Sequence, residues 1–158
     1  MEKFHRFLLI TCLPLLYFLL TGCDQKTIYS ENKMVENDVW KARNKLVFEF
    51  DVPDTATLYN FFLNVRHTTD YKYSNLYFFI STKLPDGQTG RDTLELILAD
   101  KEGKWLGKGI GKTRDYQVLL KRAVRLSKAG KYRFIIEQAM REEELEGISD
   151  VGIQISKI

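Results

Sequence analysis

The stretch that decides the fold is Leu46-Val47-Phe48-Glu49-Phe50-Asp51-Val52. Apolar side chains occupy its even positions, and the acidic residues Glu49 and Asp51 alternate with them. A β-strand turns successive side chains to opposite faces of a sheet, so this alternation is typical of a strand with one buried and one solvated face. The sequence therefore predicts a half-buried strand over residues 46–52.

The same period of two recurs along the rest of the chain. Apolar and polar residues alternate over residues 59–65, 76–80, 94–98, 132–136 and 151–155, and turn-forming sequences such as Pro85-Asp86-Gly87 separate these segments. We therefore expect an all-β domain, an antiparallel β-sandwich, of which the jelly roll is one form. The residues expected to share its interior are Phe48, Phe61, Phe78, Leu96, Phe134 and Ile153.

Two segments depart from this simple alternation. Residues 115–126 carry apolar side chains at even positions, but Leu119, Leu120 and Ala123 also fit a helical stripe, so a strand is favoured and a helix stays open. Residues 137–147 are rich in good helix formers. We expect them to form a short helical turn near the C-terminus, ended by Gly147.

The chain begins with a targeting segment. Lys3 and Arg6 form a positive end, residues 7–20 are uncharged and mainly apolar, and Leu20-Thr21-Gly22-Cys23 follows. This apolar run is shorter than the roughly 20 residues that a membrane-spanning helix needs. The order of these elements resembles a bacterial lipoprotein signal peptide. We therefore expect cleavage before Cys23 and attachment of lipid to this cysteine.

This organisation divides the 158 residues into three parts. Residues 1–22 form the lipoprotein signal peptide, residues 23–38 a polar, lipidated tether with a short strand near Ile28-Tyr29, and residues 39–158 a single β-sandwich domain. One domain of this length can bury a core of ordinary size.

Composition excludes several classes of function. The net charge is only +3, so bulk charge predicts no nucleic-acid partner. Cys12 lies in the signal peptide and Cys23 carries the lipid, which leaves no thiol for catalysis or zinc binding. His67 is the one histidine beyond the signal peptide. We therefore expect a protein that is not an enzyme, with no catalytic residues, metal or cofactor.

A glycine-rich loop at residues 106–113 is similar to a phosphate-binding loop but has the wrong spacing. Such a loop needs glycine, four residues, and then Gly-Lys-Ser/Thr. Position 106 is leucine, and Gly107 leaves only three intervening residues before Gly111-Lys112-Thr113. The sequence therefore predicts no nucleotide binding, and we interpret the loop as a bend between strands.

Three aromatic residues suggest an alternative function. Tyr71, Tyr73 and Trp105 lie in or near predicted loops, where exposed rings can stack on sugars. The plainer interpretation is that such rings pack in the core with a hydrogen-bonded tip. The first interpretation makes the protein a carbohydrate- or peptidoglycan-binding module of the envelope. Several carboxylates could form a glycosidase pair, but no spacing in the sequence fixes one.

Charge is strongly patterned in the second half of the chain. Residues 101–133 contain eleven basic and two acidic side chains, whereas residues 137–150 contain six acidic side chains and one basic residue, Arg141. One interpretation is that the basic segment forms a face that binds anionic lipid or an acidic partner. The other is that the acidic segment neutralises it on adjacent strands.

The acidic segment also holds a candidate docking turn. Met140 and Arg141 are residue types enriched at protein interfaces, so we expect Arg141 to pair with an acidic group of a partner while Met140 and Leu145 fill a pocket. The alternative is that Met140, Leu145 and Ile148 plug one end of the sandwich.

Several motifs together resemble a known family. They are the lipoprotein signal, Trp40, Phe48-Glu49-Phe50, Val65-Arg66, Tyr71-Lys72-Tyr73-Ser74-Asn75-Leu76, Trp105-Leu106-Gly107-Lys108-Gly109, Gly130-Lys131-Tyr132, Gln138-Ala139-Met140-Arg141, Leu145-Glu146-Gly147-Ile148 and Val151-Gly152. In order and spacing this set resembles the gliding-motility lipoprotein family GldH of Bacteroidota, over nearly the whole chain.

The resemblance implies a non-enzymatic lipoprotein of the cell envelope that serves as a scaffold or accessory of the gliding machinery. Its expected partners are a membrane, through the N-terminal lipid, and other envelope motility proteins. Asp24 after the cysteine acts as an inner-membrane retention signal in enteric bacteria. The outer membrane, facing the periplasm, is nevertheless the favoured location.

Overall fold

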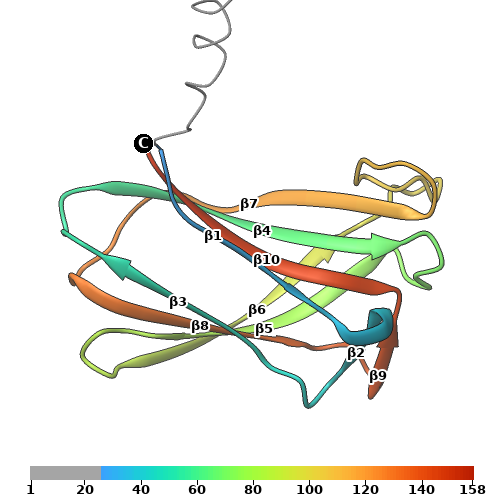
Figure 1. Cartoon of the computed structure of the whole chain (residues 1–158), viewed down its shortest axis with the longest axis horizontal. Helices are drawn as coiled ribbons and strands as arrows, with labels where there is room; N and C mark the ends of the chain where they lie inside the picture. The colour runs from blue at the N-terminus through green and yellow to red at the C-terminus, as the bar shows by residue number, and fades with distance from the viewer. Residues whose placement is uncertain (1–25) are drawn as a thin grey trace, which may run out of the picture.

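The computed structural model describes residues 26–158, in which the alternating segments form two stacked antiparallel sheets (Figure 1). The first sheet has the strand order β1 (Thr27–Met34), β10 (Ile148–Lys157), β4 (Leu58–Thr68) and β7 (Thr113–Arg125). The second has the order β3 (Leu46–Val52), β8 (Gly130–Gln138), β5 (Asn75–Lys83) and β6 (Thr89–Ile97). A separate two-stranded ribbon pairs β2 (Val39–Lys41) with β9 (Glu144–Glu146).

Strand order identifies the kind of sandwich. Numbered along the chain without the two ribbon strands, the sheets read 1-8-3-6 and 2-7-4-5. This is the order of a jelly roll, in which antiparallel strands cross from one sheet to the other. The expected all-β sandwich is confirmed.

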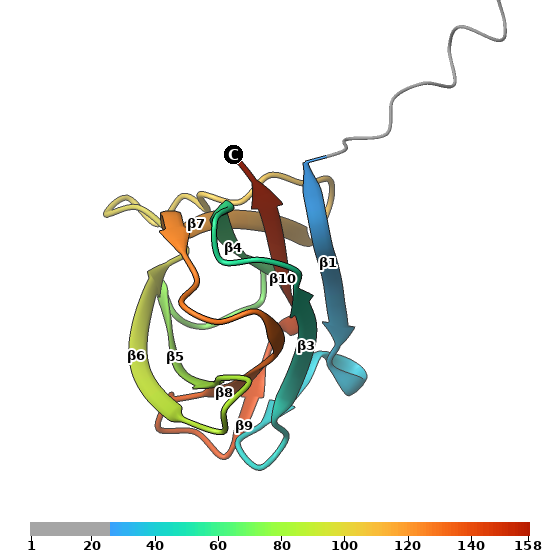
Figure 2. The ribbon, with the colours of Figure 1, turned by 90° about the vertical axis from the view of Figure 1, so that its left-hand side faces the viewer.

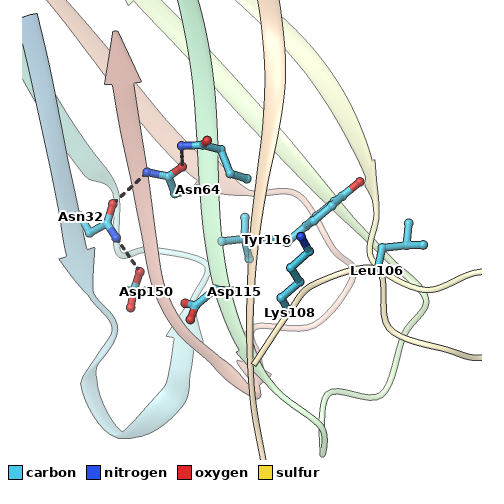
Figure 3. Close-up of a pocket in the computed structure, with 9 residues that line it drawn as sticks. Asn32, Asn64, Leu106, Lys108, Asp115, Tyr116 and Asp150 are labelled. Carbon is cyan, nitrogen blue, oxygen red and sulfur yellow. Dashed lines mark hydrogen bonds between the residues drawn. The ribbon is translucent and has the colours of Figure 1, made fainter. Parts of the chain in front are cut away.

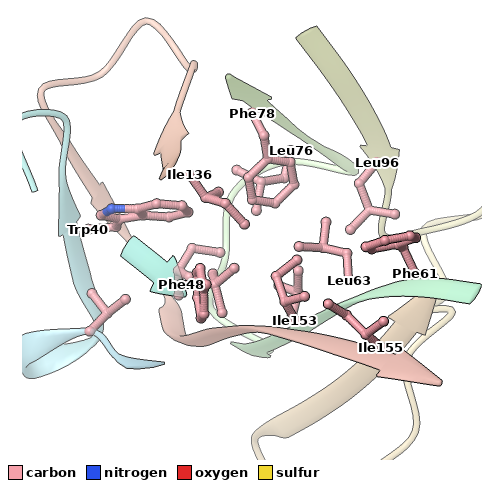
Figure 4. Packing of buried hydrophobic residues seen from close by; sticks show 14 of the residues in the cluster. Trp40, Phe48, Phe61, Leu63, Leu76, Phe78, Leu96, Ile136, Ile153 and Ile155 are labelled. Carbon is pink, nitrogen blue, oxygen red and sulfur yellow. The ribbon is translucent and has the colours of Figure 1, made fainter. Parts of the chain in front are cut away.

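The inward positions of the alternating segments form one core (Figure 4). Phe48, Phe61, Phe78, Leu96 and Ile153 are each at most 4% exposed, as expected from the period of two. Phe134 is half-buried and packs against this core from β8. Trp40 closes one end of it, because its indole stacks obliquely on Phe78 and donates from Nε1 to the carbonyl oxygen of Asn44 at 2.8 Å.

Strand β7 settles the choice left open for residues 115–126. Residues 115–125 continue the strand that starts at Thr113, and this strand pairs with β4. The pairing register shifts twice, between Tyr59 and Phe61 and between Phe61 and Phe62. These irregularities explain the mixed signal in the sequence, because each extra residue in a strand interrupts the alternation of side chains.

The expected helical turn near the C-terminus is wrong. Residues 139–143 form bends, and residues 144–146 form β9. The Gln138 side chain accepts from the Met140 amide at 2.8 Å and donates to the Glu142 carbonyl at 2.7 Å, so it satisfies backbone groups that a helix would otherwise pair. The 3₁₀ turn of the described residues lies instead at Glu36–Asp38.

The boundary expected at residue 39 also needs revision. Of the segment 23–38, residues 27–34 form β1, a full edge strand paired with β10. Its composition is polar because one face and one edge of the strand meet solvent, which makes it similar to a tether in sequence. Residues 1–22 and Cys23 lie outside the described residues. Across residues 26–158, no helix has both the length and the apolar character that crossing a bilayer requires.

Candidate functional site

The aromatic residues and the acidic turn singled out in the sequence meet at one end of the sandwich. Tyr73 follows β4, and Glu142 lies in the connection between β8 and β9, yet the Tyr73 hydroxyl donates to the Glu142 carboxylate. This distal end lies away from the end at which β1 starts and β10 finishes (Figure 1). Two sets of residues that the sequence treated separately therefore belong to one surface.

The three aromatic residues form part of a packed cluster. The Tyr71 ring is 4% exposed, its hydroxyl donates to the Asn75 carbonyl at 2.9 Å, and its centroid lies 5.7 Å from that of Tyr73. Trp105 packs edge-on against His67, with ring centroids 4.6 Å apart. Sugar stacking requires an open ring face, which Tyr71 does not offer in this arrangement. Tyr73 and Trp105 are half-buried.

His67 lies at the centre of this cluster and is fully buried. Its Nδ1 is 2.9 Å from the Thr68 carbonyl, and its Nε2 has no hydrogen-bond partner among the described residues. Burial lowers the pKa of His67, because the charged imidazolium is poorly solvated there. Within residues 26–158 no group of three or more His, Cys, Asp or Glu side chains is arranged to hold a metal ion.

The docking turn is built on the core. Leu145 is 1% exposed in β9, where it pairs with Trp40, so it is not free to enter a partner's pocket. Met140 packs against the core, and its sulfur accepts a weak hydrogen bond from the Tyr77 amide at 3.4 Å. Arg141 alone of the three side chains is exposed, and no ion pair holds it within the described residues.

Lysine side chains around the turn form ion pairs with two of its glutamates. Lys72 lies 3.1 Å from Glu146, which raises the lysine pKa, and Lys41 lies 3.7 Å from Glu144. The hydrogen bond to Glu142 raises the pKa of the Tyr73 hydroxyl. Exposed pairs of this kind are worth about 0–1 kcal/mol each, so they shape the surface more than they stabilise the fold. The result is an acidic rim beside Arg141, which is exposed and unpaired among residues 26–158.

The basic and acidic segments do not neutralise each other. Across the described residues, no ion pair links a basic residue of 101–133 to an acidic residue of 137–150. Within the basic segment, Lys112 pairs with Asp70, Lys128 with Asp86 and Arg133 with Glu49. The basic segment is therefore partly neutralised by carboxylates that lie outside the acidic segment.

A polar network that the sequence did not reveal crosses the outer face of the first sheet (Figure 3). Asn64 donates to Asn32 at 3.2 Å, and Asn32 donates to Asp150 at 3.2 Å. Arg66 joins Asp150 at 3.1 Å to Asp115 at 2.6 Å. Burial raises the pKa of Asp150, while Arg66 opposes this shift.

This network borders a shallow cavity of about 520 Å³. Its polar groups hydrogen-bond mainly to one another, so its evident role is to fasten β1 to β10 and β4. The residues of this network lie on different strands and are far apart in the sequence. The sequence alone could not reveal the network, because only the pairing register shows which outward-facing side chains are neighbours.

Comparisons with known proteins identify the family. A profile of the GldH lipoprotein family matches residues 27–155, which is almost the whole sandwich. The chain belongs to the GldH lipoprotein family. A gliding motility lipoprotein GldH homolog of Christiangramia forsetii is 37% identical over 88% of this chain and 89% of the relative. The gliding motility lipoprotein GldH of Flavobacterium johnsoniae is 34% identical over 88% and 90%.

These two GldH proteins are named for motility and lipid attachment, not for a reaction. Among solved structures, Eiger TNF from S. frugiperda aligns at 11% identity over 85% of this chain and 94% of that chain, with a TM-score of 0.38. Dimeric latent PorU from Porphyromonas gingivalis aligns at 12% identity over 84% and 13%, with a TM-score of 0.32. Likeness at these scores carries no functional argument. As a GldH lipoprotein, the protein is membrane-anchored in the cell envelope.

Proposed function

We propose that this GldH-family protein is anchored through lipid on Cys23 and acts, without catalysis, as a docking component of the gliding-motility machinery. The observation that carries the proposal is the family match over residues 27–155, together with the motility name of the Flavobacterium johnsoniae relative. Its place is the outer membrane, facing the periplasm, and its partners are other envelope motility proteins.

The two ends of the sandwich have different roles in this proposal. Strand β1 starts at Thr27, four residues after Cys23, so the end that carries Thr27 stays close to the membrane. The ten residues of β10 separate that end from the distal end by roughly 33 Å, at about 3.3 Å per residue. The acidic rim is therefore directed away from the lipid surface, toward other proteins.

Arg141 is the centre of the proposed docking surface. It is exposed and unpaired among the described residues, while Met140 and Leu145 hold the turn rigidly from below. Loops fixed on a rigid sandwich are common binding surfaces, and charges at the edge of an interface mainly set the rate and specificity of association. Arg141 therefore contacts an acidic group of the partner, and the glutamates around it face basic groups.

Genetic complementation tests the motility role. The gldH gene of Flavobacterium johnsoniae is deleted, colony spreading is recorded, and this chain is expressed in the deletion strain, with and without Cys23→Ser. We expect this chain to restore spreading and the Cys23→Ser variant to fail at equal protein levels. Failure of the correctly processed chain to restore spreading, or full rescue by Cys23→Ser, contradicts the proposal.

Crosslinking in intact cells tests the docking surface. Arg141→Glu reverses one exposed charge, so we expect it to reduce the crosslinked partners several-fold while the domain stays folded. Arg122→Glu is the matched control, because Arg122 is an exposed arginine on β7, outside the distal turn. Equal partner yields from the two variants refute docking through Arg141.

A further inference from the structure

The two edges of the sandwich differ in how they close. At one edge, Tyr29 of β1 packs on Phe50 of β3, with ring centroids 5.7 Å apart. At the other edge, formed by β7 and β6, the sheets leave a cavity of about 550 Å³ that opens to solvent. Figure 2 views the molecule from the end at which these two edges can be compared.

The cavity has an apolar interior that reaches the core. Phe61 and Ile153 are buried core residues, and both line it. The remaining apolar lining comes from the edge strands and their neighbours, namely Ile80, Leu84, Leu94, Leu120, Val124, Leu126, Tyr132 and Phe134. Contact between water and this much apolar surface is unfavourable in free energy. An apolar ligand that displaces the water is therefore stabilised in the cavity. The volume lies in the range of small-molecule sites, roughly 300–1,000 Å³.

Irregularity in β7 accompanies this opening. Both register shifts between β4 and β7 lie at the cavity, around Phe61. Ala123 adopts φ 54°, and its amide donates to the Asn60 side chain at 3.0 Å. Non-glycine residues rarely adopt such angles, and bulges of this kind often re-aim side chains beside binding sites. The backbone of β7 therefore departs from regular strand geometry where it borders the cavity.

Two cationic side chains line the cavity. Lys121 and Arg125 are exposed and line the cavity, and neither side chain makes an ion pair or hydrogen bond within residues 26–158. Asp92 of β6 is the acidic residue of the lining, and the other polar members are Thr82, Thr93 and Ser127. The β7 side of the mouth therefore suits an anionic group next to an apolar chain.

The cavity lies at the same end of the sandwich as the start of β1. Thr27 pairs with Ser156, Ser156 pairs with Asn60, and Asn60 accepts from Ala123 of β7. Three strand spacings separate Thr27 from this part of β7, which is about 14 Å. The four residues from Cys23 to Lys26 extend at most about 14 Å. Lipid on Cys23 therefore keeps the bilayer within about 28 Å of this part of β7.

We propose that this cavity takes up a long-chain fatty acid from the adjoining membrane, with its carboxylate at Lys121 and Arg125 and its single chain between the sheets. The membrane source rests on the proposed lipid anchor at Cys23. The volume of about 550 Å³ lies within the range of small-ligand sites. Fatty-acid binding gives this lipoprotein a second contact with the bilayer, distinct from its own lipid.

Photocrosslinking tests the cavity in the full chain. The protein is purified from membranes, placed in phosphatidylcholine nanodiscs, and illuminated with palmitate that carries a diazirine and an alkyne. Peptide mapping then locates the attached probe. We expect crosslinks on β6 and β7 around Leu94, Leu120 and Val124. Probe found on no cavity residue, or spread evenly over the domain, overturns the proposal.

Two pairs of variants make the test specific. Lys121→Glu with Arg125→Glu is expected to reduce crosslinking about tenfold, as for the loss of charge-assisted hydrogen bonds. Arg122→Glu leaves it unchanged, because Arg122 does not line the cavity. Leu94→Trp fills the cavity and reduces labelling, whereas Ile97→Trp, on an exposed position of the same strand, does not.

Further outcomes separate the alternatives. Equal labelling by the methyl ester of the probe contradicts the role of the two cations. Protein–protein crosslinks through this face show that a second copy covers it, and they overturn the fatty-acid site. The mass of the N-terminal peptide reports acylation of Cys23 in the same sample. Cavity labelling on an unacylated chain refutes the anchor but supports the cavity, and an acylated chain without cavity labelling refutes the cavity alone.

Discussion

Replacement of Gly152 by alanine should displace the edge strand β1 and destabilise the domain. Gly152 pairs with Asn32 of β1, and a Cβ at this position would overlap the Asn32 side-chain amide. It would also lie 2.7 Å from the Glu31 carbonyl oxygen, which belongs to the backbone and cannot rotate away. The Asn32 side chain must therefore leave its position, and β1 must shift.

The expected cost follows from the hydrogen bonds of Asn32 and from the overlap that stays after this side chain has moved. Asn32 gives up two hydrogen bonds, to Asp150 and from Asn64, which are worth about 1 kcal/mol each. The remaining overlap with the Glu31 carbonyl adds about 1–2 kcal/mol, as for other overpacked sites. A destabilisation of about 3–4 kcal/mol lowers the melting temperature of a domain of this size by about 10–15 °C.

Thermal unfolding followed by circular dichroism measures this destabilisation. Gly90→Ala is the matched control, because a Cβ on Gly90 of β6 meets nothing within 4 Å. Asn32→Ala combined with Gly152→Ala should be no less stable than Gly152→Ala alone, since the amide is already displaced, and this non-additivity should be about 2 kcal/mol. A melting temperature for Gly152→Ala that matches Gly90→Ala refutes the reasoning.

Three further predictions address the core, the buried histidine and the anchor. Phe134→Ala removes a ring 5.1 Å from that of Phe50 and should cost about 3 kcal/mol, so a negligible change in urea unfolding would mean that this residue faces solvent. Because burial lowers the folded pKa of His67, the unfolded chain binds the proton first. The free energy of unfolding should therefore fall as the pH drops below about 6.5, and His67→Gln should flatten that dependence; equal slopes for both proteins would contradict it. Cys23→Ser should abolish fatty-acid labelling and release the protein from the membrane fraction, and persistent labelling would exclude this cysteine.

The glycine-rich loop at residues 106–113 forms a bend beside β7. The backbone of Lys108 exchanges two hydrogen bonds with that of Asp115, at 2.8 and 2.7 Å, so the loop extends the first sheet beside β7. A Cβ on Gly107 would meet the Asp115 carbonyl at 3.0 Å, which explains why glycine occurs here. The spacing correctly indicated a bend between strands.

The docking turn shows the limit of propensity. Helix formers fill residues 137–147, but helix propensity is worth only tenths of a kcal/mol per residue. Pairing of β9 with β2 and burial of Leu145 outweigh it, and both depend on Trp40, about a hundred residues earlier in the chain. Sequence identified the segment as distinctive, but its conformation depends on a distant partner.

The sequence by itself indicated most of the strands, their buried faces and the family. Each of these follows from local alternation or from motifs read in order along the chain, because side chains in a strand alternate whatever that strand pairs with. Pairing is different, since it joins residues far apart, such as Asn32 with Gly152. Only the tertiary structure therefore decided that residues 27–34 belong to the sandwich, that Tyr73 meets Glu142, and that β6 and β7 leave one edge open.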